Sequence, residues 1–240
     1  MKEVRFFFAP HALQSHELPA DEAIHAIRVL RLKEGDDIFL MDGSGCFYKA
    51  TITVCNNKHC CYEVSDTMPQ TKTWSGSIHL ALAPTKSVDR MEWMAEKCTE
   101  IGFDRLTFID SHFSERRTMR VDRINKILLA AVKQSRKPWF PTVGDMTKFD
   151  DFVSAPREGL KYIAHCYDEL PRNDFYKALH QTDAGEDVTI LVGPEGDFSV
   201  DEVRLAMSNG FVPISLGQSR LRTETAGLVA VTIAQLLKRV

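Results

Sequence analysis

The sequence of 240 residues predicts an α/β protein with a β-rich N-terminal domain. Two observations predict this class. The first 70 or so residues hold short apolar runs separated by turn residues, which is typical of a small β domain. From Gly76 onwards, short apolar runs alternate with segments of helical length. This alternation predicts βαβ units and a mostly parallel sheet with helices on both faces.

The β-rich domain begins with a helix signal and a hairpin signal. Residues 36–41 and 47–52 flank the turn Asp42-Gly43-Ser44-Gly45, which indicates a β-hairpin. A helix is expected before it, from about Ala20 to Leu32. Its inward-facing residues are expected to be Ile24, Ile27, Val29 and Leu30. A small barrel with one helix is the simplest fold for this domain.

The segment Met68–Thr73 is polar and aperiodic, so we place the boundary between domains 1–72 and 73–240 there. The second domain is expected to alternate strands and helices. Strands are predicted at 77–83, 106–110, 162–165, 188–192 and 212–216. Helices are predicted at 88–101, 121–135, 175–180, 200–208 and 224–238. The sequence Ser199-Val200-Asp201-Glu202 is a capping box that sets the start of the fourth helix.

The last predicted helix is apolar on nearly all sides until Lys238. A helix of this kind must be buried on several sides. Within a single chain it would be a central helix. As the terminal helix, it is also expected to pack against a partner subunit.

Two glycine-bearing turns each connect a predicted strand to a helix. One is Gly193–Asp197, and the other runs from Gly217 to Arg222. The carboxyl ends of parallel strands meet at one edge of a sheet, so the pair predicts a small-molecule site there. Gly-Pro-Glu-Gly alone is also typical of an ordinary tight turn. Neither a P-loop nor a Rossmann glycine motif is present in the sequence, which argues against a nucleotide hydrolase.

These turns carry a resemblance to a known family. The sequences LVGPEGDFSVDEV and SLGQSRLRTETAGLVA resemble the signature blocks of the SPOUT methyltransferases. Within them, they are similar to the RsmE family, which methylates N3 of a uridine in 16S rRNA. Further matches at 25–31, 90–102, 114–116 and 133–141 extend the resemblance over most of the chain. Asp197 stands where the family has glycine, and Gln218-Ser219-Arg220 replaces the commoner Pro-Arg-Ile.

The resemblance implies a PUA-like barrel for residues 1–72 and a SPOUT domain with a trefoil knot for residues 73–240. It also implies a homodimer, the cofactor S-adenosylmethionine, and the 16S rRNA of the small ribosomal subunit as the partner. The cofactor-binding residues that it implies are Cys166, Leu191, Gly193, Pro194, Gly196, Leu216, Gly217, Leu221, Thr223 and Ala226. Leu216 and Leu221 are expected to enclose the adenine. The strand end at His165–Tyr167 is expected to form a third wall.

Methylation of uridine N3 requires loss of the imide proton, because the lone pair is otherwise occupied. A site therefore needs a base near N3 or a cation that stabilises charge on O2 and O4. Arg222 and Glu224 are the candidate catalytic residues. Glu224 is the leading candidate for the base, although a carboxylate there is also typical of helix N-terminal stabilisation. Glu195 is the alternative base.

A basic segment favours RNA binding. Between His112 and Trp139, eight basic residues stand against two acidic ones, although the net charge of the chain is −3. A solvated helix face is the alternative interpretation. The residues that we expect to bind RNA are Arg5, Arg28, Arg31, Arg116, Arg117, Lys133 and Arg136. The target base must be unstacked to enter a pocket, so a single-stranded or distorted site is expected.

Other features suggest what the protein lacks. Cys55, Cys60 and Cys61 with His59 form the densest group of metal-binding residue types, but their spacing is wrong for a zinc site. We therefore expect reduced thiols and no metal. No apolar run approaches the roughly 18 residues of a membrane span, so a cytoplasmic protein is expected. The remaining alternatives are a SPOUT enzyme acting on tRNA or a ribose 2′-hydroxyl, and a non-catalytic RNA-binding dimer.

Overall fold

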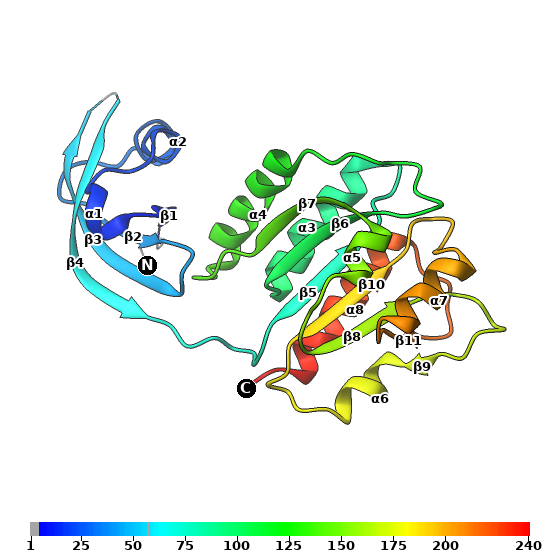
Figure 1. Ribbon diagram of the computed structural model, residues 1–240. Coiled ribbons are helices and arrows are strands. Elements are labelled where there is room, and N and C mark those ends of the chain that lie inside the picture. Colours follow the sequence, from blue (N-terminus) through cyan, green and yellow to red (C-terminus); the bar gives the residue numbers. More distant parts are fainter. Residues whose placement is uncertain (1–4, 57) are drawn as a thin grey trace. The chain divides into compact units, whose positions relative to one another are not determined.

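The computed structural model describes residues 5–56 and 58–240, which form two compact units (Figure 1). The small unit comprises the chain up to Lys72 together with Leu129–Phe140. The larger unit comprises Thr73–Leu128 and Pro141–Val240. The chain passes from the small unit to the larger one after Lys72. The segment Leu129–Phe140, however, packs with the small unit although it lies far beyond that boundary.

Hydrogen bonds explain why Leu129–Phe140 belongs to the small unit. The Gly45 N–H donates to the Pro138 carbonyl at 2.9 Å, and the Phe140 N–H donates to the Gly43 carbonyl at 3.0 Å. The segment therefore runs along the hairpin turn as a backbone partner. Such long-range pairing has no local sequence signal.

The small unit is built on a four-stranded sheet in the order β1-β2-β3-β4. β1 pairs in parallel with β2, whereas the β2–β3 and β3–β4 pairs are antiparallel. The predicted hairpin is confirmed as β2 and β3. Asp42 stabilises its turn by accepting from the Ser44 N–H at 2.8 Å and the Tyr48 hydroxyl at 2.7 Å. The strands are β1 (Phe6–Phe8), β2 (Asp37–Met41), β3 (Cys46–Cys55) and β4 (Cys60–Pro69).

The helical part of the small unit differs from the prediction. It consists of α1 (Ala12–Ser15), α2 (Ala20–Ile24) and a π-helical turn, η1 (His25–Val29). The wider turn changes which side chains face the core, so Ile24 and Val29 are 44% and 64% exposed. Their inward orientation was therefore predicted wrongly. The small residues Ala23 and Ala26 are buried instead.

The larger unit holds a seven-stranded sheet in the order β7-β6-β5-β10-β8-β11-β9, and each of its pairings is parallel. This confirms the predicted parallel sheet. All residues of β5 and β10 are buried, as expected for central strands covered on both faces. The strands are β5 (Ile78–Leu82), β6 (Arg105–Asp110), β7 (Thr142–Lys148), β8 (Leu160–Ala164), β9 (Asn173–Asp174), β10 (Val188–Val192) and β11 (Val212–Ser215).

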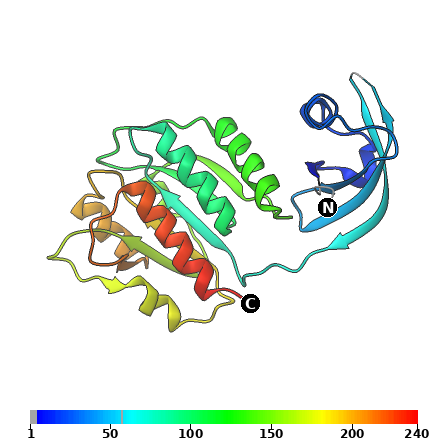
Figure 2. The same ribbon diagram turned by 180° about the vertical axis from the view of Figure 1, so that it is seen from behind.

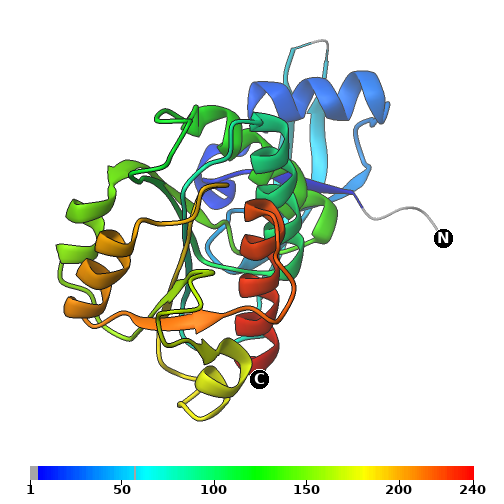
Figure 3. The same cartoon turned by 90° about the vertical axis from the view of Figure 1, so that its right-hand side faces the viewer.

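Helices cover both faces of this sheet (Figures 2 and 3). Figure 2 shows α3 and α8 side by side on one face, and α5 and α7 pack together on the other. The sequence predicted four of the helices with these bounds and missed α5, β7 and β9. The helices are α3 (Val88–Ile101), α4 (Val121–Ser135), α5 (Phe149–Ser154), α6 (Phe175–His180), α7 (Val200–Ser208) and α8 (Thr223–Leu237).

Helix α8 lies close against the sheet because it carries a glycine at the contact. A Cβ atom on Gly227 would stand 2.8 Å from Leu82 Cδ1 in β5. The opposite side of α8 is partly open, and Leu236 is 53% exposed. Trp93 on the neighbouring α3 is 43% exposed.

Among the described residues, no helix has the length and apolar character needed to cross a membrane.

A buried histidine in β5 makes the fold sensitive to acid. His79 Nε2 lies 2.9 Å from the Thr107 hydroxyl, and the side chain is 9% exposed. Burial, with smaller contributions from Arg105 and Arg157, lowers the pKa of His79 from 6.5 to about 3. The unfolded chain thus takes up a proton below pH 6.5 that the folded chain does not.

We expect the wild-type protein to lose stability relative to His79→Gln as the pH falls from 6.5 towards 3. The difference grows by about 1.4 kcal/mol per pH unit, so it should reach about 2 kcal/mol between pH 6.5 and pH 5. Urea unfolding across this range measures it. The same substitution at the partly exposed His180, His180→Gln, is the control, and parallel pH profiles for wild type and His79→Gln would contradict the prediction.

Candidate active site

A cavity of about 830 Å³ lies at the carboxyl ends of β8, β10 and β11. Three chain segments line it, at 164–174, 192–197 and 214–226, and Arg90 of α3 completes the wall. Both glycine-bearing turns contribute to this lining. The edge of the sheet at which the sequence predicted a small-molecule site therefore does hold a cavity.

The two turns are joined by a hydrogen bond. The Thr223 hydroxyl, at the start of α8, donates to the Gly193 carbonyl at 3.0 Å, and Thr223 is 5% exposed. Gly193 is enclosed by its own turn, because a Cβ atom there would lie 3.0 Å from the Phe198 nitrogen. Gly217 in the second turn adopts a φ of +124°, which favours glycine. Two glycines and a buried hydroxyl thus hold this part of the cavity wall in place.

Asp197 connects the first turn to the end of β8. Its φ is +67°, a backbone conformation that favours glycine. The side chain compensates by accepting two backbone hydrogen bonds, from the Cys166 N–H and the Phe198 N–H, both at 2.7 Å. Aspartate tolerates this conformation better than most residues because its short side chain bonds locally. Asp197 therefore replaces glycine and adds a link between two cavity walls.

Two buried polar atoms in the cavity wall have no hydrogen-bond partner among residues 5–56 and 58–240. They are Nε2 of His165 and Oε2 of Glu224. His165 is 4% exposed and Glu224 is 7% exposed. Burial lowers the pKa of His165, so the ring is neutral near pH 7. Arg90 Nε lies 3.7 Å from Glu224 Oε1 and leaves the other carboxylate oxygen open.

Most of the predicted cofactor and catalytic residues line the cavity. Leu191 does not, because it lies fully buried in the middle of β10. Gly196 is also outside the lining, and a Cβ atom there would stand 3.0 Å from Phe113 Cβ. The predicted residues in the lining are Cys166, Gly193, Pro194, Leu216, Gly217, Leu221, Arg222, Thr223, Glu224 and Ala226.

Several lining residues were not predicted to belong to the site. Arg172 and Asp168 form an ion pair at 2.6 Å beside the His165 carbonyl, which Arg172 Nη1 also contacts at 3.2 Å. Their signal in the sequence was their place in the segment that follows the predicted strand 162–165. Glu195, the alternative base, accepts from the Lys86 N–H at 3.1 Å and thus stabilises backbone.

The residues predicted to bind RNA in the small unit differ in their exposure and in their contacts with other side chains. Arg28 and Arg31 are exposed, and Arg5 is half-buried. Lys133 Nζ forms an ion pair with Glu22 at 2.6 Å, and its charge is therefore largely compensated. Arg136 lies over a phenylalanine ring, that of Phe6, at 5.4 Å.

In the larger unit, the predicted cations hold the loop between β6 and α4. Arg116 donates to the Thr85 carbonyl at 3.2 Å and to the Lys86 carbonyl at 2.7 Å. Arg117 pairs with Asp110. A carbonyl carries no net charge, so these hydrogen bonds do not neutralise the positive charge of Arg116. The charge of Arg117, by contrast, is compensated by the Asp110 carboxylate.

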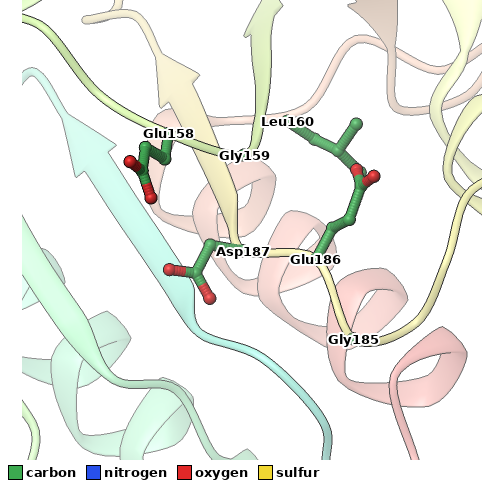
Figure 4. Close-up of a pocket in the computed structure, with 6 residues that line it drawn as sticks. All are labelled: Glu158, Gly159, Leu160, Gly185, Glu186 and Asp187. Atoms are coloured by element: carbon green, nitrogen blue, oxygen red, sulfur yellow. The ribbon is translucent and has the colours of Figure 1, made fainter.

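A second cavity, of about 460 Å³, lies at the opposite, amino ends of β8 and β10 (Figure 4). Its carboxylates belong to Glu158, Glu186 and Asp187. Asp187 accepts from the Ser77 N–H at 2.8 Å and is thus part of the backbone framework. Within residues 5–56 and 58–240, no group of three His, Cys, Asp or Glu residues is placed to hold a metal ion. The cavity at the carboxyl ends is the better candidate for chemistry.

Fold and cavity together define a class of protein: an α/β enzyme domain with a small-molecule site at two strand-to-helix turns, joined to a small β unit. Residues 72–235 match the model of the RNA methyltransferase domain, and residues 18–64 match the RNA methyltransferase PUA domain. The chain belongs to this RNA methyltransferase family, and it is similar to proteins named ribosomal RNA small subunit methyltransferase E.

Known proteins with this combination are similar along the whole chain. A Synechocystis protein named "Ribosomal RNA small subunit methyltransferase E" is 28% identical over 208 residues, which are 85% of this chain and 67% of that protein. A "probable rRNA-methyltransferase" from Porphyromonas gingivalis has a crystal structure with 42% identity, a TM-score of 0.91 and 98% coverage of both chains. The Neisseria gonorrhoeae ribosomal RNA small subunit methyltransferase E, solved bound to S-adenosyl methionine, shows 25% identity, a TM-score of 0.84 and 98% coverage of both chains.

The link made by Asp197 can be tested by substitution. Asp197→Ala removes both acceptors and leaves a Cβ residue at positive φ, so we expect a loss of about 2 to 3 kcal/mol in unfolding free energy. Asp197→Asn keeps one of the two acceptor oxygens and tolerates this φ, so its loss should be smaller, about 1 to 2 kcal/mol. Denaturant unfolding gives both values, and hydrogen exchange should show lost protection at both the Cys166 and Phe198 amides in the alanine variant but at one of them in the asparagine variant. Equal losses in the two variants would contradict this account.

Proposed function

We propose that this protein transfers the methyl group of S-adenosylmethionine to N3 of a uridine in the 16S rRNA of the small ribosomal subunit. The observation that carries the proposal is the cavity in which both glycine turns meet Arg222 and Glu224. The names of the relatives support ribosomal RNA as the substrate, and the Neisseria structure supports the cofactor.

The cavity wall fits S-adenosylmethionine. It offers backbone groups at Gly193, Gly217 and Thr223 for the polar edges of a nucleoside, and the side chains of Leu216 and Leu221 for its flat faces. The two unpartnered buried atoms, a donor on His165 and an acceptor on Glu224, indicate that a polar ligand completes the site. The bound cofactor supplies an electrophilic methyl group on a sulfonium, which leaves as a thioether without needing an acid.

We assign the removal of the N3 proton to Glu224. Its Oε2 is buried, unpartnered in the described chain and beside the cavity, whereas Glu195 is occupied by a backbone amide. The guanidinium of Arg90 orients the carboxylate from the other side. Arg222 is exposed at the rim, where its permanent charge can stabilise the negative charge that spreads onto O2 and O4 of the uracil.

For RNA binding we assign the exposed cations of the small unit, Arg28 and Arg31, together with Arg116 of the larger unit. Arg5, Arg117, Lys133 and Arg136 belong to the same proposal, although Lys133 and Arg117 share their charges with carboxylates. Because the reacting nitrogen lies inside a base pair in duplex RNA, the enzyme is expected to take an unpaired or everted uridine.

The same proposal extends to the fold of each unit, the location of the protein and its assembly. The small unit is proposed to close into a PUA-like barrel around β1 to β4. The return of the chain from β11 to α8, beside α3 and bonded to the first turn, supports a trefoil-knotted topology in the larger unit. A ribosomal RNA substrate supports a cytoplasmic location. The partly open face of α3 and α8 supports a homodimer.

Methylation of small-subunit particles that lack the modification tests the function. With labelled S-adenosylmethionine, the wild-type protein should place a single N3-methyluridine in the 16S rRNA, which mass spectrometry maps. Glu224→Gln keeps the shape of the side chain but cannot accept the proton, so turnover should fall at least about 100-fold while cofactor affinity stays within about threefold.

Unchanged turnover in Glu224→Gln would exclude Glu224 as the base. Methylation of tRNA or of a ribose hydroxyl, or the absence of cofactor binding, would overturn the proposed function itself.

The proposed dimer face can be tested with two leucines of equal exposure. Leu236 on α8 and Leu13 on α1 are both 53% exposed. Leu236→Asp places a charge in the face of α3 and α8 and should convert a dimer into a monomer in sedimentation experiments, because a buried unpaired charge is costly. Leu13→Asp is the matched control and should remain dimeric. A dimer that survives Leu236→Asp would place the interface elsewhere.

A further inference from the structure

Two cysteines stand opposite each other near the end of the hairpin formed by β3 and β4. The strand register pairs Cys55 of β3 with Cys60 of β4. A β-bulge causes this pairing, because the register shifts by one residue between Ile52 and Val54. Without the extra residue, Val54 would stand opposite Cys60. The bulge therefore brings together two thiols that methyl transfer does not use.

The backbone hydrogen bonds show that this pair occupies a non-hydrogen-bonded position of the ladder. In the adjacent pair, the Asn56 N–H donates to the His59 carbonyl at 3.0 Å. The Cys60 carbonyl is directed away from Cys55, because it accepts from the Leu18 N–H at 2.9 Å. Bonded and non-bonded pairs alternate along antiparallel strands, and the Cα atoms of a non-bonded pair are about 4.5 Å apart. A disulfide spans this separation without movement of the backbone.

Both thiols lie on the core face of the sheet. Cys60 is fully buried in the core of the small unit, and the half-buried Cys55 packs against that core. Burial, followed by the charge and hydrogen bonding of the neighbouring Cys55, raises the pKa of Cys60 to about 12. Cys61 pairs with Val54 and, because side chains alternate along a strand, belongs to the other face. Cys55 and Cys60 are thus neighbours on one face.

We propose that Cys55 and Cys60 form an oxidation site, at which a small disulfide converts the two thiols into a reversible cross-strand disulfide. The half-buried Cys55 is the thiol that an external disulfide can reach, and the fully buried Cys60 is the thiol that closes the bond. Oxidation at this site is independent of methyl transfer.

The reaction is a pair of thiol–disulfide exchanges. The Cys55 thiolate attacks one sulfur of the small disulfide, whose S–S bond breaks and releases one small thiol. The Cys60 thiolate then attacks the Cys55 sulfur of the mixed disulfide, and the second small thiol leaves. Two electrons pass from the cysteines to the small disulfide, and the two protons of the cysteines pass to the released thiols.

Oxidation also changes a contact to the helical part of the small unit. In the reduced protein, Cys55 Sγ donates to the Leu32 carbonyl at 3.2 Å. A disulfide sulfur has no hydrogen to donate, so this bond is lost when the disulfide forms. The small unit therefore exchanges a hydrogen bond to the segment after η1 for a covalent link across the hairpin.

Peptide mapping of the full chain detects the disulfide directly. The protein is incubated with glutathione disulfide, its remaining thiols are alkylated, and it is digested with trypsin. Cleavage after Lys58 separates the two cysteines, because peptide 50–58 holds Cys55 and peptide 59–72 holds Cys60. We expect the two peptides to be joined after oxidation and separate after treatment with dithiothreitol. Dilution of the protein should leave the joined fraction unchanged, because the bond forms within one chain.

Three single variants assign the link. Cys61→Ser leaves Cys60 as the one cysteine of its peptide and should keep the link. Cys55→Ser should leave the two peptides separate. Cys46→Ser changes another half-buried cysteine of β3 and, as the matched control, should keep the link.

The same mapping defines the results that would overturn the proposal. One is the absence of joined peptides in oxidised Cys61→Ser protein. Another is a stable glutathione adduct on Cys55 that Cys60 does not displace. A link that persists in Cys55→Ser, or that disappears on dilution, would show that other thiols or two chains are involved.

Discussion

The hydrogen bond from the Thr223 hydroxyl to the Gly193 carbonyl joins the two turns on which the site depends. Thr223 is the first residue of α8, and Gly193 follows β10, so this bond ties the last helix to a central strand. The close contact of Gly227 with Leu82 extends the same attachment along α8. Because both glycine turns line the cavity, its shape depends on how accurately these elements are held.

The attachment of α8 also determines which polar groups face the cavity. Glu224 directly follows Thr223, so the bond that joins the turns places the carboxylate at the wall, with Arg90 of α3 beside it. On the other side, the carboxylate of Asp197 holds the end of β8 and with it His165. An enzyme gains from such rigidity, because groups that are already in place need no reorganisation when the ligand binds.

Within the small unit, some basic side chains are paired with carboxylates and others are not, which is consistent with a division of roles. Lys133 is neutralised by Glu22 in a largely buried pair, which holds Leu129–Phe140 to the small unit rather than presenting a charge. Arg28 and Arg31 are exposed in the same unit. A buried ion pair contributes to the specificity of packing more than to net stability, whereas exposed arginines are available to a phosphate backbone.

The sequence by itself determined the features that depend on neighbouring residues. The capping box of Ser199 and Glu202, the hairpin turn around Asp42, the parallel sheet and both glycine turns follow from local chemistry, and so the edge that holds the cavity could be predicted. Only the tertiary structure decided the rest. The pairing of Leu129–Phe140 with the hairpin and the open Nε2 of His165 arise between segments far apart in the chain, where no local pattern records which backbone group or side chain will be the partner.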